Sequence, residues 1–251
     1  MILIKKKLFN HLRNLGIKKG DNLLVYSKLS SFGIINNQLP EIIIECLIKK
    51  IGKRGSLVMP LYTFGKKKEL FDIKKIYPNS MIGLLNKKFF ERKSILRSKC
   101  PIHSHIGIGP NSKCLNMSNL HYSFGKKSDF YYFHKKNFKM VLLGCTPQEG
   151  ATYFHHLEAI VSVSYRKWVV LKRKVIDYKK NKIKFLKINF FSTKKNIKYD
   201  LNKAFNDIVR LGAKLKEDNL KYGNSYSMSL KDLHKYGLIL LKKNKNALII
   251  K

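Results

Sequence analysis

The sequence is short of acidic residues. Its 251 residues include 15 Asp and Glu against 52 Lys and Arg, which gives a formal net charge of +37 at pH 7. Such an excess attracts nucleic acid, anionic lipid and phosphorylated ligands, and it repels polycations. The lysines are spread through nearly every segment, without the single basic stripe that a nucleic-acid site requires. We therefore expect a solvated basic surface and no specific nucleic-acid partner; a basic nucleic-acid-binding protein without catalysis is the alternative.

Cysteines and long apolar runs are also scarce. The four cysteines, Cys46, Cys100, Cys114 and Cys145, show no paired spacing, and no secretory signal precedes them. We expect reduced thiols in a cytoplasmic protein. No apolar run reaches the roughly 18 residues that a membrane-spanning helix needs, so we expect no membrane span. Without an internal repeat or a long linker, the chain is expected to form a single domain over residues 1–251.

Helix and strand patterns alternate along the chain. The first sixty residues predict a helix at 2–15, a strand at 23–26, a helix at 41–51 and a strand at 56–59. A helix at 83–92 and a buried strand at 140–143 follow. This order predicts an α/β fold with a central mixed β-sheet flanked by helices. Segments 169–176 and 183–191 predict a hairpin, 200–217 a helix, and the apolar stretches 237–241 and 247–250 a closing hairpin.

Residues 150–167, GATYFHHLEAIVSVSYRK, contain the strongest candidate for catalysis. If Thr152 caps a helix here, His155 and Glu158 lie three residues apart on one face. A carboxylate beside an imidazole fixes its tautomer and makes its free nitrogen a better base. His156 is only two residues from Glu158 and should point elsewhere. By pattern alone, a surface pair is the usual explanation of this spacing, so the prediction depends on its context.

Residues 97–105 hold the densest cluster of functional side chains. The surrounding segment 96–110 has too many polar, Gly and Pro residues for a core element. A zinc site would use Cys100, His103, His105 and Cys114. That set lacks the usual CxxC or HxxxH pairs, and we expect no metal. A second interpretation gives Arg97 and Lys99 to a phosphate and points Ser104 at a carbonyl oxygen; the third is a polar loop.

Two other candidates follow predicted strands. Ser27, Ser30, Ser31 and Gly33 could offer hydroxyl and backbone N–H donors to a phosphate, or could form an ordinary capping loop. Cys145 follows the strand ending near residue 144 and could be a nucleophile beside His155, although a buried structural thiol is the usual case. A hydrolase or thiol transferase using Cys145 or Ser104 is therefore a further alternative.

Several segments together resemble the aminoglycoside 3-N-acetyltransferase family, in order along nearly the whole chain. They are GDNLLVYSKLSSFG, GKRGSLVMPLYTF, PNSMIGLL, LRSKCPIHSHIGIGP, SFGKKSDF, VLLG, ATYFHHLE and VSYRK. The RSxxPxxS element, followed by TxxHxxE after the VLLG strand, is specific in that order. The resemblance implies transfer of an acetyl group from acetyl-CoA to the amine of an amino sugar, by direct attack and without an acyl-enzyme.

The resemblance also implies roles for individual residues. His155 would be the base, Glu158 its partner, and Ser104 would lie beside the thioester carbonyl. The coenzyme would be lined by Ser27, Lys28, Ser30, Ser31, Phe32, Gly33, Pro60, Arg97, His103, Ser104 and Ile106. Family members usually have Asn, Pro and His where this chain has Ala151, Ser164 and Tyr26.

The net charge bears on the acceptor. A surface at +37 should repel a polycation, so we expect a neutral or anionic amino sugar, such as a nucleotide-linked or polysaccharide-pathway intermediate. The alternative is an aminoglycoside drug, which would make the protein an antibiotic-resistance enzyme. A homo-oligomer is compatible with either acceptor.

Overall fold

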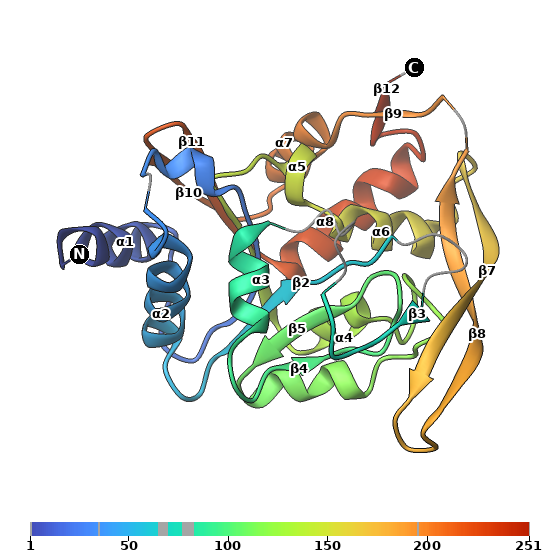
Figure 1. Ribbon diagram of the computed structural model, residues 1–251. Coiled ribbons are helices and arrows are strands. Elements are labelled where there is room, and N and C mark those ends of the chain that lie inside the picture. The colour runs from blue at the N-terminus through green and yellow to red at the C-terminus, as the bar shows by residue number, and fades with distance from the viewer. Residues whose placement is uncertain (1, 35, 65–69, 77–82, 195, 251) are drawn as a thin grey trace.

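The computed structural model describes residues 2–34, 36–64, 70–76, 83–194 and 196–250. The sequence pattern also predicts an irregular Lys-rich stretch over 65–80; most of it lies outside these residues, and its described part includes the short strand β3 (Leu70–Phe71). Within the described residues, a central sheet has the strand order β10-β11-β6-β1-β2-β5-β4 (Figure 1). Its strands are β1 (Asn22–Ser27), β2 (Ser56–Pro60), β4 (Leu96–Arg97), β5 (His105–Ile108), β6 (Phe138–Leu143), β10 (Leu215–Leu220) and β11 (Gly223–Ser229).

The centre of this sheet is parallel and its flanks are antiparallel. β1 runs parallel to β2 and β6, with Leu24 opposite Val58 and Met140. β5 is antiparallel to β2, and β11 is antiparallel to β6. The expected mixed sheet is therefore confirmed. The central strands are apolar throughout because both of their faces are covered.

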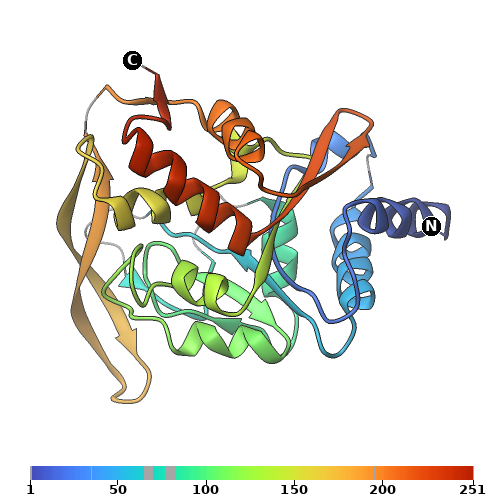
Figure 2. The ribbon, with the colours of Figure 1, turned by 180° about the vertical axis from the view of Figure 1, so that it is seen from behind.

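Alternate residues of β1 pack into two cores. Leu23 and Val25 face a core formed with α1 (Ile2–Asn14), α2 (Leu39–Ile51) and α3 (Leu84–Phe90). Leu24 and Tyr26 face the opposite core, seen from behind in Figure 2. That core is covered by α4 (Asp129–Lys135), α6 (Tyr153–Val161), α7 (Leu201–Arg210) and α8 (Leu230–Lys243). The period of two residues thus gives the sheet a helical layer on each face.

A long hairpin forms one side of the molecule in Figure 1. β7 (Arg166–Asp177) and β8 (Lys182–Thr193) pair along their full length, and β3 (Leu70–Phe71) adds to β7. The short elements are η1 (Leu29–Phe32), η2 (Pro110–Asn116), α5 (Pro147–Gly150), β9 (Lys198–Tyr199) and β12 (Ile249–Ile250). The hairpin predicted from alternation is confirmed. Among the described residues, none of the helices is both long and apolar enough to cross a membrane.

Three predictions of local structure were wrong. The segment from residue 97 is not irregular throughout, because β5 lies in the central sheet and most of its residues are buried. The helix predicted over 200–217 ends at Arg210, and β10 begins at Leu215. Residues 237–241 lie in α8 and do not form a closing strand. In each case a local polarity pattern was overridden by packing against distant segments.

Candidate active site

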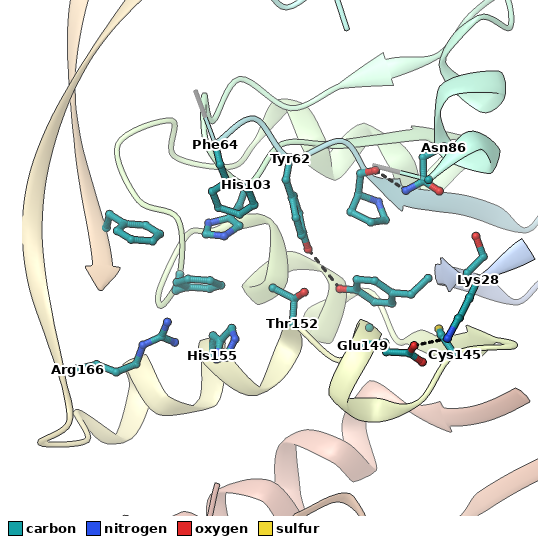
Figure 3. A pocket seen from close by; sticks show the side chains of 17 residues that line it. Lys28, Tyr62, Phe64, Asn86, His103, Cys145, Glu149, Thr152, His155 and Arg166 are labelled. Carbon is teal, nitrogen blue, oxygen red and sulfur yellow. Dashed lines mark hydrogen bonds and ion pairs between the residues drawn. The ribbon is translucent and has the colours of Figure 1, made fainter. Parts of the chain in front are cut away.

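A cavity opens where the parallel strands end. Tyr26 and Ser27 come from the end of β1, Pro60 from the end of β2, and Cys145 follows β6. The carboxyl ends of such strands are where open α/β sheets bind their ligands. The cavity measures about 490 Å³ (Figure 3). Its lining residues are Tyr26, Ser27, Lys28, Pro60, Tyr62, Phe64, Gly83, Asn86, His103, Phe124, Cys145, Glu149, Gly150, Thr152, His155, Arg166 and Phe190.

His155 and Glu158 meet as the sequence predicted. Both lie on α6, and His155 Nδ1 is 2.7 Å from Glu158 Oε2. The His155 side chain is 22% exposed and lines the cavity, whereas Glu158 is fully buried. Glu158 therefore holds one ring nitrogen and leaves the other for a ligand. This geometry suits a general base whose tautomer is fixed by a carboxylate behind it.

Arg166 joins this pair from the start of β7. Its Nη1 donates to the same Oε2 at 2.6 Å, and its Nη2 donates to Thr193 Oγ1 at 3.1 Å. Burial alone would raise the pKa of Glu158, but the hydrogen bond from His155 and the charges of His155 and Arg166 bring that pKa below its ordinary value. Glu158 is thus a carboxylate at neutral pH. Local spacing provided no signal for Arg166, because only the turn after Val161 brings it back to α6.

One detail of α6 differs from expectation. The helix ends at Val161. Thr152 occupies the position before its first turn, but within the described structure its side chain makes no capping hydrogen bond, and it faces the cavity. His156 points away from Glu158, as expected. It accepts a hydrogen bond from the Gly125 N–H at 3.1 Å, and burial lowers its pKa to about 3.

His103 lines the other wall among aromatic rings. It lies 5.0 Å from Tyr62 and 4.5 Å from Phe124, measured between ring centroids. Burial and the neighbouring cationic groups hold its pKa well below the ordinary value, so it is neutral. Among the described residues, its buried Nδ1 has no hydrogen-bond partner. His103 can therefore contact a bound molecule as a neutral imidazole.

The residues expected to line a coenzyme fall into two groups. Ser27, Lys28, Pro60 and His103 line the cavity. Lys28 pairs with Glu149 at 2.6 Å, and this hydrogen bond lowers the pKa of Glu149. The remaining expected residues, Ser30, Ser31, Phe32, Gly33, Arg97, Ser104 and Ile106, do not line it.

The reasons are clearest for the 97–106 segment. Arg97 is buried, and its guanidinium donates to the carbonyl oxygen of Lys75 at 2.7 Å and to Ser104 Oγ at 3.1 Å. Ser104 has no exposed surface and donates to the Leu61 carbonyl oxygen at 2.6 Å. Ile106 is buried in β5. The structure therefore turns Arg97 and Ser104 away from a phosphate or thioester in this cavity.

The loop after β6 is held by a line of hydrogen bonds from α1. Asp218 Oδ2 lies 2.6 Å from His11 Nδ1, and His11 Nε2 lies 2.9 Å from Ser225 Oγ. Ser225 Oγ accepts the Gly144 N–H at 3.0 Å, and the Gly144 carbonyl accepts Ser31 Oγ at 2.5 Å. Gly144 has φ +67°, and a Cβ there would meet Ser31. This line fixes the loop between β6 and the helix that carries His155.

The thiols do not form a reactive or metal-binding group. Cys145 lines the cavity but is only 4% exposed, and burial raises its pKa to about 12. It is a thiol at neutral pH, which does not favour the nucleophilic alternative. In the part of the chain that the structure describes, no three His, Cys, Asp or Glu side chains are placed to hold a metal.

The fold and sequence have known relatives. A family model described as aminoglycoside 3-N-acetyltransferase matches residues 24–241. Aminoglycoside N(3)-acetyltransferase III of a Salmonella species is 24% identical over 184 residues, which cover 66% of this chain and 63% of that protein. The prophage-derived aminoglycoside N(3')-acetyltransferase-like protein YokD of Bacillus subtilis (strain 168) is 27% identical over 180 residues, 61% and 64% of the two chains. The matches thus span less than two thirds of these relatives.

Solved structures share the fold over nearly the whole chain. The aminoglycoside acetyltransferase AAC(3)-IIb superposes with a TM-score of 0.82 at 19% identity, covering 96% of this chain and 97% of that one. For AAC(3)-IVa without ligand, the TM-score is 0.79 at 21% identity, with 98% and 91% covered. For AAC-IIIb with CoASH, it is 0.78 at 17% identity, with 95% and 96% covered.

Proposed function

Because the chain belongs to the aminoglycoside 3-N-acetyltransferase family, we propose that it transfers the acetyl group of acetyl-CoA to an amine of an aminoglycoside. The observation that carries the proposal is the His155–Glu158 pair, fixed at 2.7 Å at the wall of the cavity. We also propose, as the sequence predicts, that the protein is cytoplasmic and that residues 1–251 form a single domain.

The expected neutral or anionic acceptor is not adopted. The named relatives are aminoglycoside acetyltransferases, and one neighbouring structure, an AAC(3)-IVa variant, is a complex with a gentamicin. These findings fit the alternative acceptor better. Among the described residues that line the cavity, Glu149 is the one carboxylate, and it is paired with Lys28; Glu158 lies behind His155. Acceptor charge is therefore the property that a substrate screen should vary.

Different residues of this chain would have different roles in the reaction. Glu158 holds His155 Nδ1, so the remaining ring nitrogen can take a proton from the acceptor amine as it attacks the thioester carbonyl. Arg166 keeps Glu158 ionised, so the imidazolium formed in this step has a carboxylate beside it. Lys28 lies at the end of the cavity opposite Arg166 (Figure 3), and with Ser27 and Pro60 it would hold acetyl-CoA. Lys28 there offers a cation to the phosphates.

The test is acetyl transfer by wild type and His155→Ala, with kanamycin-type aminoglycosides and a nucleotide-linked amino sugar as acceptors. We expect His155→Ala to lower kcat by about 100-fold or more, because general-base catalysis contributes about 10²–10⁴-fold. Acetyl-CoA should raise the melting temperature of both proteins equally. Absence of transfer to any aminoglycoside, or full activity of His155→Ala, would refute the proposal.

A further inference from the structure

A second buried acid–imidazole pair lies behind the cavity. His105 Nδ1 is 2.7 Å from Asp129 Oδ2, and the two side chains are 0% and 3% exposed. Ser98 Oγ donates to the same carboxylate oxygen at 2.6 Å and accepts the His105 N–H at 2.9 Å. Asp129 begins α4 and His105 begins β5, so the pair joins a helix to the central sheet.

The burial of this pair decides which ring atom carries hydrogen. A buried carboxylate without a compensating charge is costly, and in the described structure the ion-pair partner of Asp129 is His105. The pair as a whole should therefore be neutral. Whether the shared proton lies on Asp129 or on Nδ1, the other nitrogen, Nε2, then also carries a hydrogen. Nε2 is a donor in both arrangements.

That donor faces Tyr62. The distance from His105 Nε2 to the Tyr62 hydroxyl oxygen is 3.3 Å, and the rings meet edge to face. When Tyr62 accepts this hydrogen bond, its own O–H can donate elsewhere; the Tyr26 hydroxyl lies 3.5 Å away, and both tyrosines line the cavity. Burial raises the pKa of Tyr62 well above its ordinary value, so the hydroxyl stays protonated. It is a donor held in orientation from behind.

Tyr62 and the proposed base line the same cavity. Figure 3 shows its hydroxyl pointing to the region of Thr152, with His155 further along the same wall. Thr152 is one helical turn before His155, whose N–H donates to the Thr152 carbonyl at 3.0 Å. Ser104, the residue that the family resemblance placed beside the thioester carbonyl, is buried and bonded elsewhere. The described cavity therefore offers Tyr62 as a donor in its place.

We propose that the Tyr62 hydroxyl is a catalytic hydrogen-bond donor to the thioester oxygen, and that Asp129 and His105 are its positioning residues. This inference rests on the proposed acetyl transfer. The amine nitrogen bonds to the carbonyl carbon, the carbonyl electrons move to oxygen, and Tyr62 stabilises the resulting oxyanion. His155 takes the amine proton. When the carbonyl re-forms, the C–S bond breaks and the departing thiolate receives that proton.

The experiment compares Tyr62→Phe with Tyr153→Phe. Tyr153 is a matched control, because its buried hydroxyl also bonds a histidine, His234 Nδ1 at 3.0 Å, but it does not line the cavity. We expect Tyr62→Phe to lower kcat by about 100-fold, as loss of one oxyanion donor does in other enzymes. The KM for acetyl-CoA should change by less than about threefold. Tyr153→Phe should keep the wild-type kcat.

The positioning role is tested by a double-mutant cycle. Asp129→Asn should lower kcat, and Tyr62→Phe/Asp129→Asn should be no slower than Tyr62→Phe alone, since both act through one hydroxyl. If Asp129→Asn does not fold, Ser98→Ala replaces it in the cycle, because this substitution removes the hydrogen bond that Ser98 Oγ donates to Asp129. Additive losses would overturn the positioning role.

The outcomes separate this inference from the proposed function. A Tyr62→Phe protein with wild-type kcat, measured beside an inactive His155→Ala protein, would overturn the role of Tyr62 and leave acetyl transfer intact. A wild-type protein without acetyl transfer would overturn both.

Discussion

At the scale of the residue, one oxygen atom connects the proposed base to the hairpin. Glu158 Oε2 lies 2.7 Å from His155 and 2.6 Å from Arg166, and Glu158 is fully buried. Removing the charge of Glu158 would leave Arg166 buried without its anion. Stability and activity should therefore fall together when Glu158 is neutralised.

We predict that Glu158→Gln lowers the free energy of unfolding by about 3 kcal/mol at neutral pH, as loss of one partner of a buried ion pair does. Urea denaturation measures this change. Glu149→Gln is the control, because the Lys28–Glu149 pair is exposed and should contribute much less to stability. Equal losses in the two variants would contradict the prediction.

The same comparison has a pH dependence of known sign. The pKa of Glu158 is lower in the folded protein than its ordinary value of 4.5. The ionised side chain therefore stabilises the fold fully above pH 4.5, and this contribution is lost as the pH falls through the lower folded pKa. The advantage of wild type over Glu158→Gln should shrink on acidification below pH 4.5. An advantage that grows on acidification would be inconsistent with this assignment.

The cysteines give a second prediction at this scale. All four are buried, and burial raises the pKa to about 11 for Cys100 and to about 12 for Cys114 and Cys145. Because the thiolate is the reactive form, native protein at neutral pH should react with a thiol reagent far more slowly than denatured protein. Mass spectrometry after alkylation counts the modified residues. Rapid labelling of Cys145 alone would instead support the alternative in which Cys145 is a nucleophile.

Sequence alone could predict the His155–Glu158 pair because both members lie within one helical turn. It could not predict Arg166 as their partner, or His105 as the partner of Asp129, since those contacts depend on how distant elements pack. It also favoured Ser104, whose hydroxyl is used inside the fold. Local spacing identified the His155–Glu158 pair, and only the tertiary structure identified the groups around it.

At the scale of the element, the contact between α8 and α6 depends on a glycine. Gly237 is buried in the middle of α8, and a Cβ there would overlap Leu157 Cδ1 of α6. The apolar stretch 237–241 resembled a strand because so short an apolar run fits a buried strand as well as a helix segment. Its true state became evident only from this packing.

We predict that Gly237→Ala destabilises the protein by about 1–3 kcal/mol, the usual cost of overpacking a core. Intrinsic helix propensity alone would favour alanine by about 1 kcal/mol, so the sign of the measured change in the free energy of unfolding shows which effect dominates. Thermal unfolding measures the change. Lys231→Ala, at an exposed position of the same helix, serves as the control. A Gly237→Ala protein more stable than wild type would show that α8 can move away from α6.

The predicted elements were most reliable where one periodicity held over many residues. The hairpin β7–β8 and helices α1 and α2 needed no distant partner to be recognised. β5 was missed because its segment is rich in polar, Gly and Pro residues. One of the polar residues, His105, is acceptable in a buried strand because Asp129 bonds it. That group is 24 residues away in the chain.

At the scale of the whole molecule, the net charge of +37 has opposite effects on the two proposed substrates. It attracts anionic acetyl-CoA and repels a cationic acceptor, and salt screens both effects. We predict that raising the ionic strength increases the KM for acetyl-CoA and decreases the KM for a polycationic aminoglycoside. Steady-state kinetics in buffers of increasing KCl measure both constants. If both KM values rise together, the acceptor does not meet this repulsive field.

The line of hydrogen bonds from Asp218 through His11 and Ser225 to Gly144 and Ser31 gives the amino-terminal helix a function beyond covering the sheet. Deleting α1 would remove the His11 imidazole from the middle of that line. The side chains of Asp218 and Ser225 would then lose this hydrogen-bond partner and bond to water instead. The backbone between β6 and α5 would then lose its fixed position, although no residue near the thioester had been changed. We therefore expect a protein that lacks α1 to have a lower turnover while it keeps its remaining secondary structure.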